Sequence, residues 1–404
     1  MKRLSKIGCL VVALVMLFYQ GFMGTVSACA SVEQVVDIEK RNYITEQAAL
    51  YIAENFVEDS WLDGLSYTWD ENSYLNINIQ CYDMNDNISA YVFDVSDSMT
   101  ETNEGYIVVG ASRVYCPIIE YSETAEFPFE EYLEDGDKLI YEGGTNYYGY
   151  DRTNEQLYLC NPDHVKVMKQ EITKVTSLNE KVTEQWEQLN DSKISHAEQT
   201  IAENAVSVYS DYGRASTTNK IEVTPLPQNF YVMTKFKNAT GYVDSCCAPT
   251  AAINLMFYYY CKNTSYYSSL KVGGSNVDNT FTQISKLMKT DETGTRNDLI
   301  APAIKSYLRD KTAFDNSTTS YMSLVALNAT QMVNDLRNNK PVILILKNHE
   351  RYGNHAVVCV GIREYDNGNI YYTLADGWYN YLRTMNAYGG NAEYTDAVSV
   401  HLFK

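Results

Sequence analysis

The chain has 404 residues, with 51 acidic and 32 basic side chains, which gives a formal net charge of -19 at pH 7. Nucleic acids and anionic membranes are held chiefly by Lys and Arg, so this charge excludes them as main partners. The length predicts two domains and a connector behind an export segment.

Residues 1–30 have the pattern of an export signal. A basic start is followed by an apolar run that is too short to span a bilayer comfortably. Residues 28–30 read Ala-Cys-Ala, the small-x-small form that a signal peptidase cuts, so Ser31 is predicted to be the first mature residue. The alternative is a bacterial lipobox, in which Cys29 is lipidated and anchors the protein. Val26 stands where that motif prefers leucine, so free secretion from a bacterium is the favoured interpretation.

Residues 31–150 are predicted to form a first, smaller α+β unit. Residues 45–56 carry apolar side chains at helical spacing, and the segments behind them read as strands. A helix followed by consecutive strands indicates an α+β layer with an antiparallel sheet. The unit has no histidine and no catalytic constellation. The predicted strands lie at 75–81, 90–95, 105–111 and 114–121.

Residues 151–226 have the composition of a connector. Residues 164–206 are rich in Lys, Glu, Gln and Asn around periodic apolar positions, which predicts one or two surface helices. The stretch 209–224 is polar and turn-rich, and Pro225 and Pro227 follow it. We therefore expect a domain boundary here and an exposed site for proteolysis.

The second domain, 227–404, is organised around the stretch 244–260. Pro249 stands two positions after Cys247, and an almost wholly apolar run follows. Proline is favoured in the first turn of a helix, and an apolar run on every face predicts a buried central helix. A thiol at the start of such a helix feels unpaired N–H groups and the positive end of the helix dipole, which favour the thiolate. Cys247 is therefore a candidate nucleophile, although a free cysteine more often only packs.

Cysteine usage indicates a reactive thiol and gives no sign of a disulfide or zinc framework. Of nine cysteines, two lie within residues 1–30, and the seven that remain leave at least one thiol unpaired. No CxxC repeat is present, so no metal site and no cofactor are predicted. The seven are Cys81, Cys116, Cys160, Cys246, Cys247, Cys261 and Cys359.

A candidate base and its orienting group follow on the predicted strands of this domain. His355 opens an apolar strand, which can aim its imidazole rigidly, and Asp376 ends the next strand. The Asp376 carboxylate is predicted to accept a hydrogen bond from the second ring nitrogen of His355, and an asparagine there would be partly tolerated. Cysteine, histidine and orienter in this order fit thiol acyl transfer. The predicted helices are 281–288, 299–308 and 330–338, and the strands are 341–346, 355–361, 370–374 and 397–403.

These motifs resemble a papain-like cysteine peptidase, particularly the secreted relatives of the bacteriocin-leader (double-glycine) peptidases. Residues 247–251 (Cys-Ala-Pro-Thr-Ala), 355–361 (His-Ala-Val-Val-Cys-Val-Gly) and 376–378 (Asp-Gly-Trp) carry the resemblance, which spans roughly 227–404. It implies a two-lobed α+β domain with a central helix and an antiparallel sheet. It also implies an endopeptidase with a Cys-His-Asp triad. The triad residues are Cys247, His355 and Asp376.

The first unit is similar to the pro-segment of streptopain-type peptidases at 105–109 and 117–122. That resemblance implies a zymogen in which an autoinhibitory pro-domain, 31–150, covers the cleft until the chain is cut between Tyr209 and Pro227. The mature enzyme is expected to be a monomer that acts on a peptide or protein substrate.

One position departs from the family pattern. A glutamine that helps hold the oxyanion is usual about six residues before the nucleophile, and Gly241 stands there. Asn238 is the nearest side-chain amide and the candidate oxyanion donor. The alternative is a turn asparagine beside Gly241, in which case the backbone N–H of Cys247 still donates.

Two other functions remain open on these residues. One is another thiol acyl-transfer enzyme with the same triad, transglutaminase-like or amidase-like. The other is a non-catalytic module whose degenerate site holds a peptide. Peptide turnover that a thiol alkylator blocks would separate a peptidase from the binding module, and ammonia release or cross-linking would indicate the other enzyme.

Overall fold

The computed structural model describes residues 43–404 except 67, 144–146, 161–165, 168–179, 190–216, 228, 242–244, 324–329, 350–352, 366–367 and 388–392. Residues 45–404 pack as one unit. The predicted export segment with Cys29 and the predicted cleavage stretch as far as residue 216 lie outside the described residues.

The N-terminal part follows the predicted order of one helix and then antiparallel strands. Helix α2 (Glu46–Leu62) begins where Thr45 Oγ1 accepts the N–H of Ala48 at 3.2 Å, and it packs against the first three strands. Strands β1 (Ser73–Tyr82), β2 (Ile88–Asp97), β3 (Asn103–Gly110) and β4 (Ile118–Ser122) pair in chain order. A short group extends the sheet beyond β1, namely β5 (Lys138–Ile140), β6 (Tyr148–Asp151), β7 (Gln156–Leu159) and β8 (Lys166–Val167).

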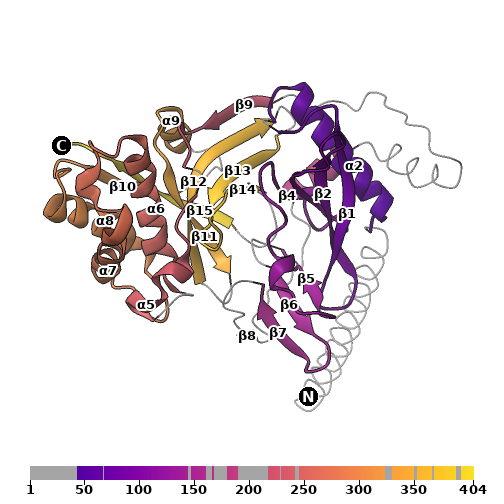
Figure 1. The fold of residues 1–404 in the computed structure, drawn as a ribbon, viewed down its shortest axis with the longest axis horizontal. Helices are drawn as coiled ribbons and strands as arrows, with labels where there is room; N and C mark the ends of the chain where they lie inside the picture. Colours follow the sequence, from indigo (N-terminus) through magenta and orange to yellow (C-terminus); the bar gives the residue numbers. More distant parts are fainter. Residues whose placement is uncertain are drawn as a thin grey trace, which may run out of the picture. The chain divides into compact units, whose positions relative to one another are not determined.

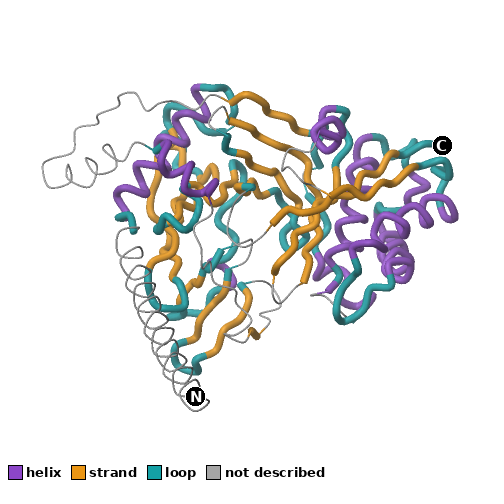
Figure 2. Tube along the Cα trace, turned by 180° about the vertical axis from the view of Figure 1, so that it is seen from behind, coloured by secondary structure: helices purple, strands orange, loops and turns teal. Residues whose placement is uncertain are grey.

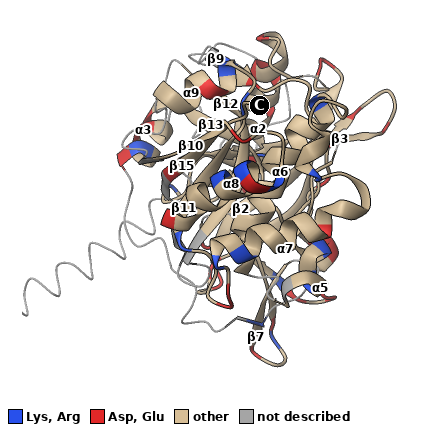
Figure 3. Ribbon diagram, turned by 90° about the vertical axis from the view of Figure 1, so that its left-hand side faces the viewer, with Lys and Arg blue, Asp and Glu red and all other residues tan. Residues whose placement is uncertain are grey.

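Helix α6 (Cys247–Lys262) lies at the centre of the C-terminal part. It carries no charged residue before Lys262, because helices and strands cover it, whereas the helices around it carry several (Figure 3). Figures 1 and 2 show these helices together on one side of the strands. They are α5 (Lys237–Thr240), α7 (Val277–Met288) and α8 (Asn297–Lys311).

The C-terminal strands run in the order β10, β15, β11, β12, β13 and β14, and β9 pairs with β12. The predicted strands at 341–346, 355–361, 370–374 and 397–403 all appear, with somewhat different ends. Helix α9 (Thr330–Arg337) packs against β9, β11, β12 and β15. The bounds are β9 (Thr217–Glu222), β10 (Thr318–Ser323), β11 (Val342–His349), β12 (Gly353–Tyr365), β13 (Ile370–Ala375), β14 (Arg383–Asn386) and β15 (Glu393–His401).

A strand that the sequence did not predict joins the two parts. β14 pairs with β13 on one side and with β4 on the other, where Thr384 lies opposite Tyr121 and Met385 opposite Glu120. The two predicted α+β sheets are therefore one mixed sheet system, visible as the run from β12 to β4 in Figure 1. Leaving this edge unpaired would expose backbone N–H and C=O groups on both strands.

The predicted connector is more ordered at its ends than its composition suggests. β7 ends at Leu159 and β9 begins at Thr217, so both ends of 151–226 belong to the sheet. Helix α3 (Glu180–Gln188) buries Trp186, whose indole N–H donates to the carbonyl of Tyr115 at 2.7 Å. Among the described residues, no helix has the length and apolar character needed to cross a bilayer.

Candidate active site

Cys247 is the first residue of α6 and is 8% exposed. Pro249 occupies the first turn, where its missing N–H is not needed, and the apolar residues behind it hold the helix in the core. Backbone N–H groups of Ala356, Ala248 and Cys247 itself interact with the thiol sulfur. Burial nevertheless raises the pKa of the Cys247 thiol above its ordinary value, and these N–H groups offset only part of the shift.

His355 lies at the start of β12, opposite Leu346 of β11, and its side chain is buried. Its Nε2 lies 2.9 Å from the backbone carbonyl oxygen of Asp376. A carbonyl only accepts, so Nε2 carries the proton and Nδ1 is the free acceptor of the neutral ring. Trp378 stacks beside the imidazole, with ring centres 6.0 Å apart and an interplanar angle of 19°.

A hydrogen bond at Ala356 links the start of α6 to the strand that carries His355. Ala356 follows His355 in β12, and its N–H reaches the sulfur of Cys247 at the start of α6. Burial lowers the pKa of His355, and the Asp376 carboxylate and carbonyl act against this shift, while Arg383 adds to it. Both pKa shifts favour the uncharged forms near pH 7, a thiol at Cys247 and a neutral imidazole at His355.

Asp376 lies beside His355 as predicted, but its carboxylate does not make the predicted contact. Oδ1 accepts the N–H of Trp378 at 2.9 Å and that of Tyr379 at 3.1 Å. Oδ2 accepts Nη1 of Arg383 at 2.8 Å. The main-chain carbonyl is offered to His355 instead, because the carboxylate caps the turn through Gly377, whose φ is 80°.

Arg383 and Glu120 belong to the site, and the sequence reasoning missed both. Arg383 pairs with Asp376 through Nη1 and with Glu120 of β4 through Nη2, and all three side chains are buried. Burial acts to lower the pKa of Arg383, but the two carboxylates outweigh it and raise that pKa, so the guanidinium stays charged. A glutamate inside the apolar strand 118–122 was the available signal of a buried partner.

The other predicted residues have simpler surroundings. Asn238 is exposed on α5, which ends at Gly241 with φ of 77°, and residues 242–244 between it and the nucleophile are outside the described part. The structure therefore leaves its oxyanion role as a prediction. His401, the last residue of β15, pairs with Asp335 of α9 at 2.8 Å. The described residues contain no cluster of three or more potential metal ligands.

The arrangement predicts how Cys247 reacts with a thiol alkylator in the intact chain. Because burial raises the pKa of its thiol, the rate with iodoacetamide should climb steadily between about pH 6 and about pH 9. Mass spectrometry of the peptide that contains Cys247 measures the rate, and the exposed Cys261 serves as a reference thiol. A rate that is already at a plateau at acid pH would mean that a thiolate–imidazolium pair is formed in the intact chain.

A buried thiol at a helix start, whose sulfur meets the backbone N–H that follows a histidine held in one tautomer, fits thiol-dependent acyl transfer. Residues 220–397 match the Peptidase_C39 like family, and the chain is a cysteine peptidase. The solved structure of a fragment of Prevotella intermedia prointerpain A, in a cysteine-to-alanine mutant form, is similar, with a TM-score of 0.37 and 12% sequence identity over 81% of this chain and 98% of that one. No curated protein matches the chain.

Proposed function

We propose that the protein is an exported bacterial cysteine endopeptidase made as a zymogen, with a two-lobed papain-like domain behind a pro-domain. The observation that carries the mechanism is the contact of the Cys247 sulfur with the N–H beside His355, whose ring Asp376 holds through its carbonyl. Export is proposed from the signal-like pattern of residues 1–30, and a lipid anchor at Cys29 is the alternative proposal.

In the proposed reaction, the thiol of Cys247 attacks the carbonyl carbon of the scissile peptide bond, and its proton passes to Nδ1 of His355. The backbone N–H of Cys247 donates to the oxyanion, with Asn238 as the candidate side-chain donor. The imidazolium then gives its proton to the leaving amine, which leaves a thioester on Cys247. Water, deprotonated by the same imidazole, releases the acid product. Nε2 of His355 keeps its proton and its hydrogen bond to the Asp376 carbonyl oxygen throughout the reaction.

Digestion of a peptide library by the purified protein tests this function. New peptide ends that appear with the native chain and vanish after alkylation of Cys247 are expected, because the thiol is the nucleophile. Ammonia release or cross-linking without new peptide ends would place the protein with transglutaminase-like or amidase-like enzymes. Tight peptide binding without any turnover would indicate a degenerate binding module.

Activation by cleavage of the connector is a further part of this proposal. β9 places residues 217–222 in the sheet, and the N–H of Thr224 donates to Asn339 Oδ1 at 2.8 Å. The cut is expected within the predicted stretch between Tyr209 and Pro227, at residues outside this pairing, because proteases rarely cut backbone that is hydrogen-bonded in a sheet. Cleavage there should raise turnover about tenfold or more, since the pro-domain of the proposed zymogen then no longer holds the cleft closed.

A variant that carries a foreign protease recognition sequence in place of 209–215 provides the controlled measurement. Peptide turnover is compared before and after that protease acts, with an active-site titrant to count reactive Cys247. The same variant without protease is the control. Equal titration and equal turnover in the two samples would mean that the intact chain is not a zymogen.

A further inference from the structure

Three buried charged side chains run from the N-terminal strands to the active site. Glu120 on β4, Arg383 on β14 and Asp376 behind β13 are at most 2% exposed. Arg383 Nη1 lies 2.8 Å from Asp376, Nη2 pairs with Glu120, and the hydroxyl of Tyr106 donates to Glu120 at 3.0 Å. Each of these groups depends on the others, because an unpaired charge in the interior is strongly unfavourable.

This row of charged side chains ends at Asp376, on the turn that holds the catalytic imidazole. The Asp376 carboxylate binds the N–H groups of Trp378 and Tyr379, and this fixes the direction of the Asp376 carbonyl. That carbonyl accepts from His355, and Trp378 lies against the same ring. A change in the carboxylate is therefore transmitted to the imidazole through the main chain.

The N-terminal part fixes Arg383 from two directions. Glu120 binds its Nη2, and the ring of Phe129 lies 4.9 Å from its guanidinium carbon. The β4–β14 pairing holds the backbone of the same region. This arrangement supports the turn behind the imidazole.

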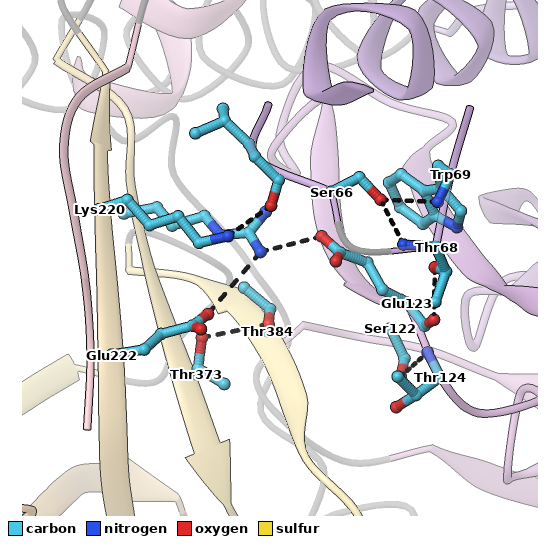
Figure 4. A network of polar contacts seen from close by, with 12 residues as sticks. Ser66, Thr68, Trp69, Ser122, Glu123, Thr124, Lys220, Glu222, Thr373 and Thr384 are labelled. Carbon is cyan, nitrogen blue, oxygen red and sulfur yellow. Dashed lines mark hydrogen bonds and ion pairs between the residues drawn. The ribbon is translucent and has the colours of Figure 1, made fainter. Parts of the chain in front are cut away.

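A second buried arginine joins the same two parts of the chain without touching the active site. Arg363 on β12 lies 2.9 Å from Glu123, next to β4, and 3.8 Å from Glu222 on β9. Figure 4 shows Glu123, from the N-terminal part, and Glu222, from the C-terminal part, in one polar network, with Lys220 nearby. Each arginine thus lies between one carboxylate from the N-terminal part and one from the C-terminal part, so this pair is a matched control for Arg383.

We propose that Arg383 is a positioning residue for His355 and that Glu120 holds Arg383 in place. The N-terminal part, which supplies Glu120, therefore remains bound after connector cleavage as a component of the working enzyme. This inference rests on the proposed roles of Cys247 and His355. It gives the N-terminal part a second role, since a cover alone would leave the active site once the chain is cut. Two-chain association follows from the shared sheet and the buried pairs.

The decisive comparison is Glu120→Gln against Glu123→Gln in the full chain after connector cleavage. Both remove one buried carboxylate that faces an arginine, so both should lower the melting temperature. Only Glu120→Gln should lower kcat, by about tenfold with KM unchanged, when rates are counted per titrated Cys247. Equal kcat values in the two variants would overturn the positioning role and leave only a structural one.

Further variants separate an effect on positioning from an effect on the stability of the fold. Tyr106→Phe removes the hydroxyl bond to Glu120 without changing charge and should lower kcat in the same direction by a smaller factor. Arg383→Lys keeps the charge without the two-pronged fork and should recover part of the kcat that Arg383→Met loses. Equal kcat in Arg383→Lys and Arg383→Met would contradict the inference.

Gel filtration of the cut native protein tests the continued association. Co-elution of the two fragments with peptidase activity is the expected result. Dissociation with full activity in the C-terminal fragment would overturn the inference and leave the peptidase assignment intact. If the native cut protein and all variants lack turnover, the proposed function itself fails.

Discussion

Cys247→Ala is expected to lower kcat/KM for peptide cleavage by at least about a thousandfold, because the reaction loses its nucleophile. Cys246→Ser is expected to keep most of the activity. Cys246 precedes α6 and is fully buried, and its sulfur accepts the hydroxyl of Thr250 at 3.9 Å. A serine can replace that contact at a cost of about 1 kcal/mol in stability.

The two variants change adjacent cysteines at the start of the same helix, so each serves as a control for the other. Steady-state cleavage of a peptide substrate gives kcat/KM, and the unfolding transition shows that both chains are folded. An inactive Cys246→Ser beside an active Cys247→Ala would invalidate the motif alignment from which the triad was taken. Every assignment at His355 and Asp376 would then need to be revised.

The elements that carry Cys247 and His355 were predictable because their signals are local. Pro249 and the apolar run behind it predict a buried helix that starts at Cys247, and α6 begins at that residue. Apolar β-branched residues after His355 predict a buried strand, and β12 contains them. Short-range preference and pattern agree at both places, so the sequence specifies these elements strongly.

Arg383 and its partner could not be identified in the same way. β14 is four residues long and reads Arg-Thr-Met-Asn, which has no strand periodicity. Glu120 is 263 positions away in sequence, so only the β4–β14 pairing brings it to Arg383. The sequence showed an unusual charge in an apolar strand without showing which residue neutralises it.

The sequence predicted that Asp376 contacts His355, but it assigned the contact to the carboxylate and not to the backbone carbonyl. Sequence spacing places a carboxylate near the imidazole, but the positive φ of Gly377 and the arginine on β14 decide where that carboxylate points. The interaction with His355 falls to the carbonyl of the same residue. This difference changes what substitutions at Asp376 should do.

Asp376→Ala is expected to lower kcat about a hundredfold with little change in KM. The turn loses the acceptor for the N–H groups of Trp378 and Tyr379, and Arg383 loses one of its two carboxylate partners. The carbonyl that fixes Nε2 of His355 is then no longer held in place. Rates per titrated Cys247 separate this effect from the lower stability that an unbalanced buried arginine also causes.

Asp376→Asn distinguishes the two ways in which Asp376 can serve the imidazole. In the structure the residue accepts from Arg383 on one oxygen and from two backbone N–H groups on the other, so either orientation of an amide sets its NH2 group against a donor. The asparagine variant should therefore lose nearly as much kcat as the alanine variant. Nearly full activity of Asp376→Asn would instead mean that the side chain turns to His355 in the working enzyme, where an amide oxygen accepts as well as a carboxylate. Full activity of Asp376→Ala would reduce Asp376 to a turn residue before Gly377.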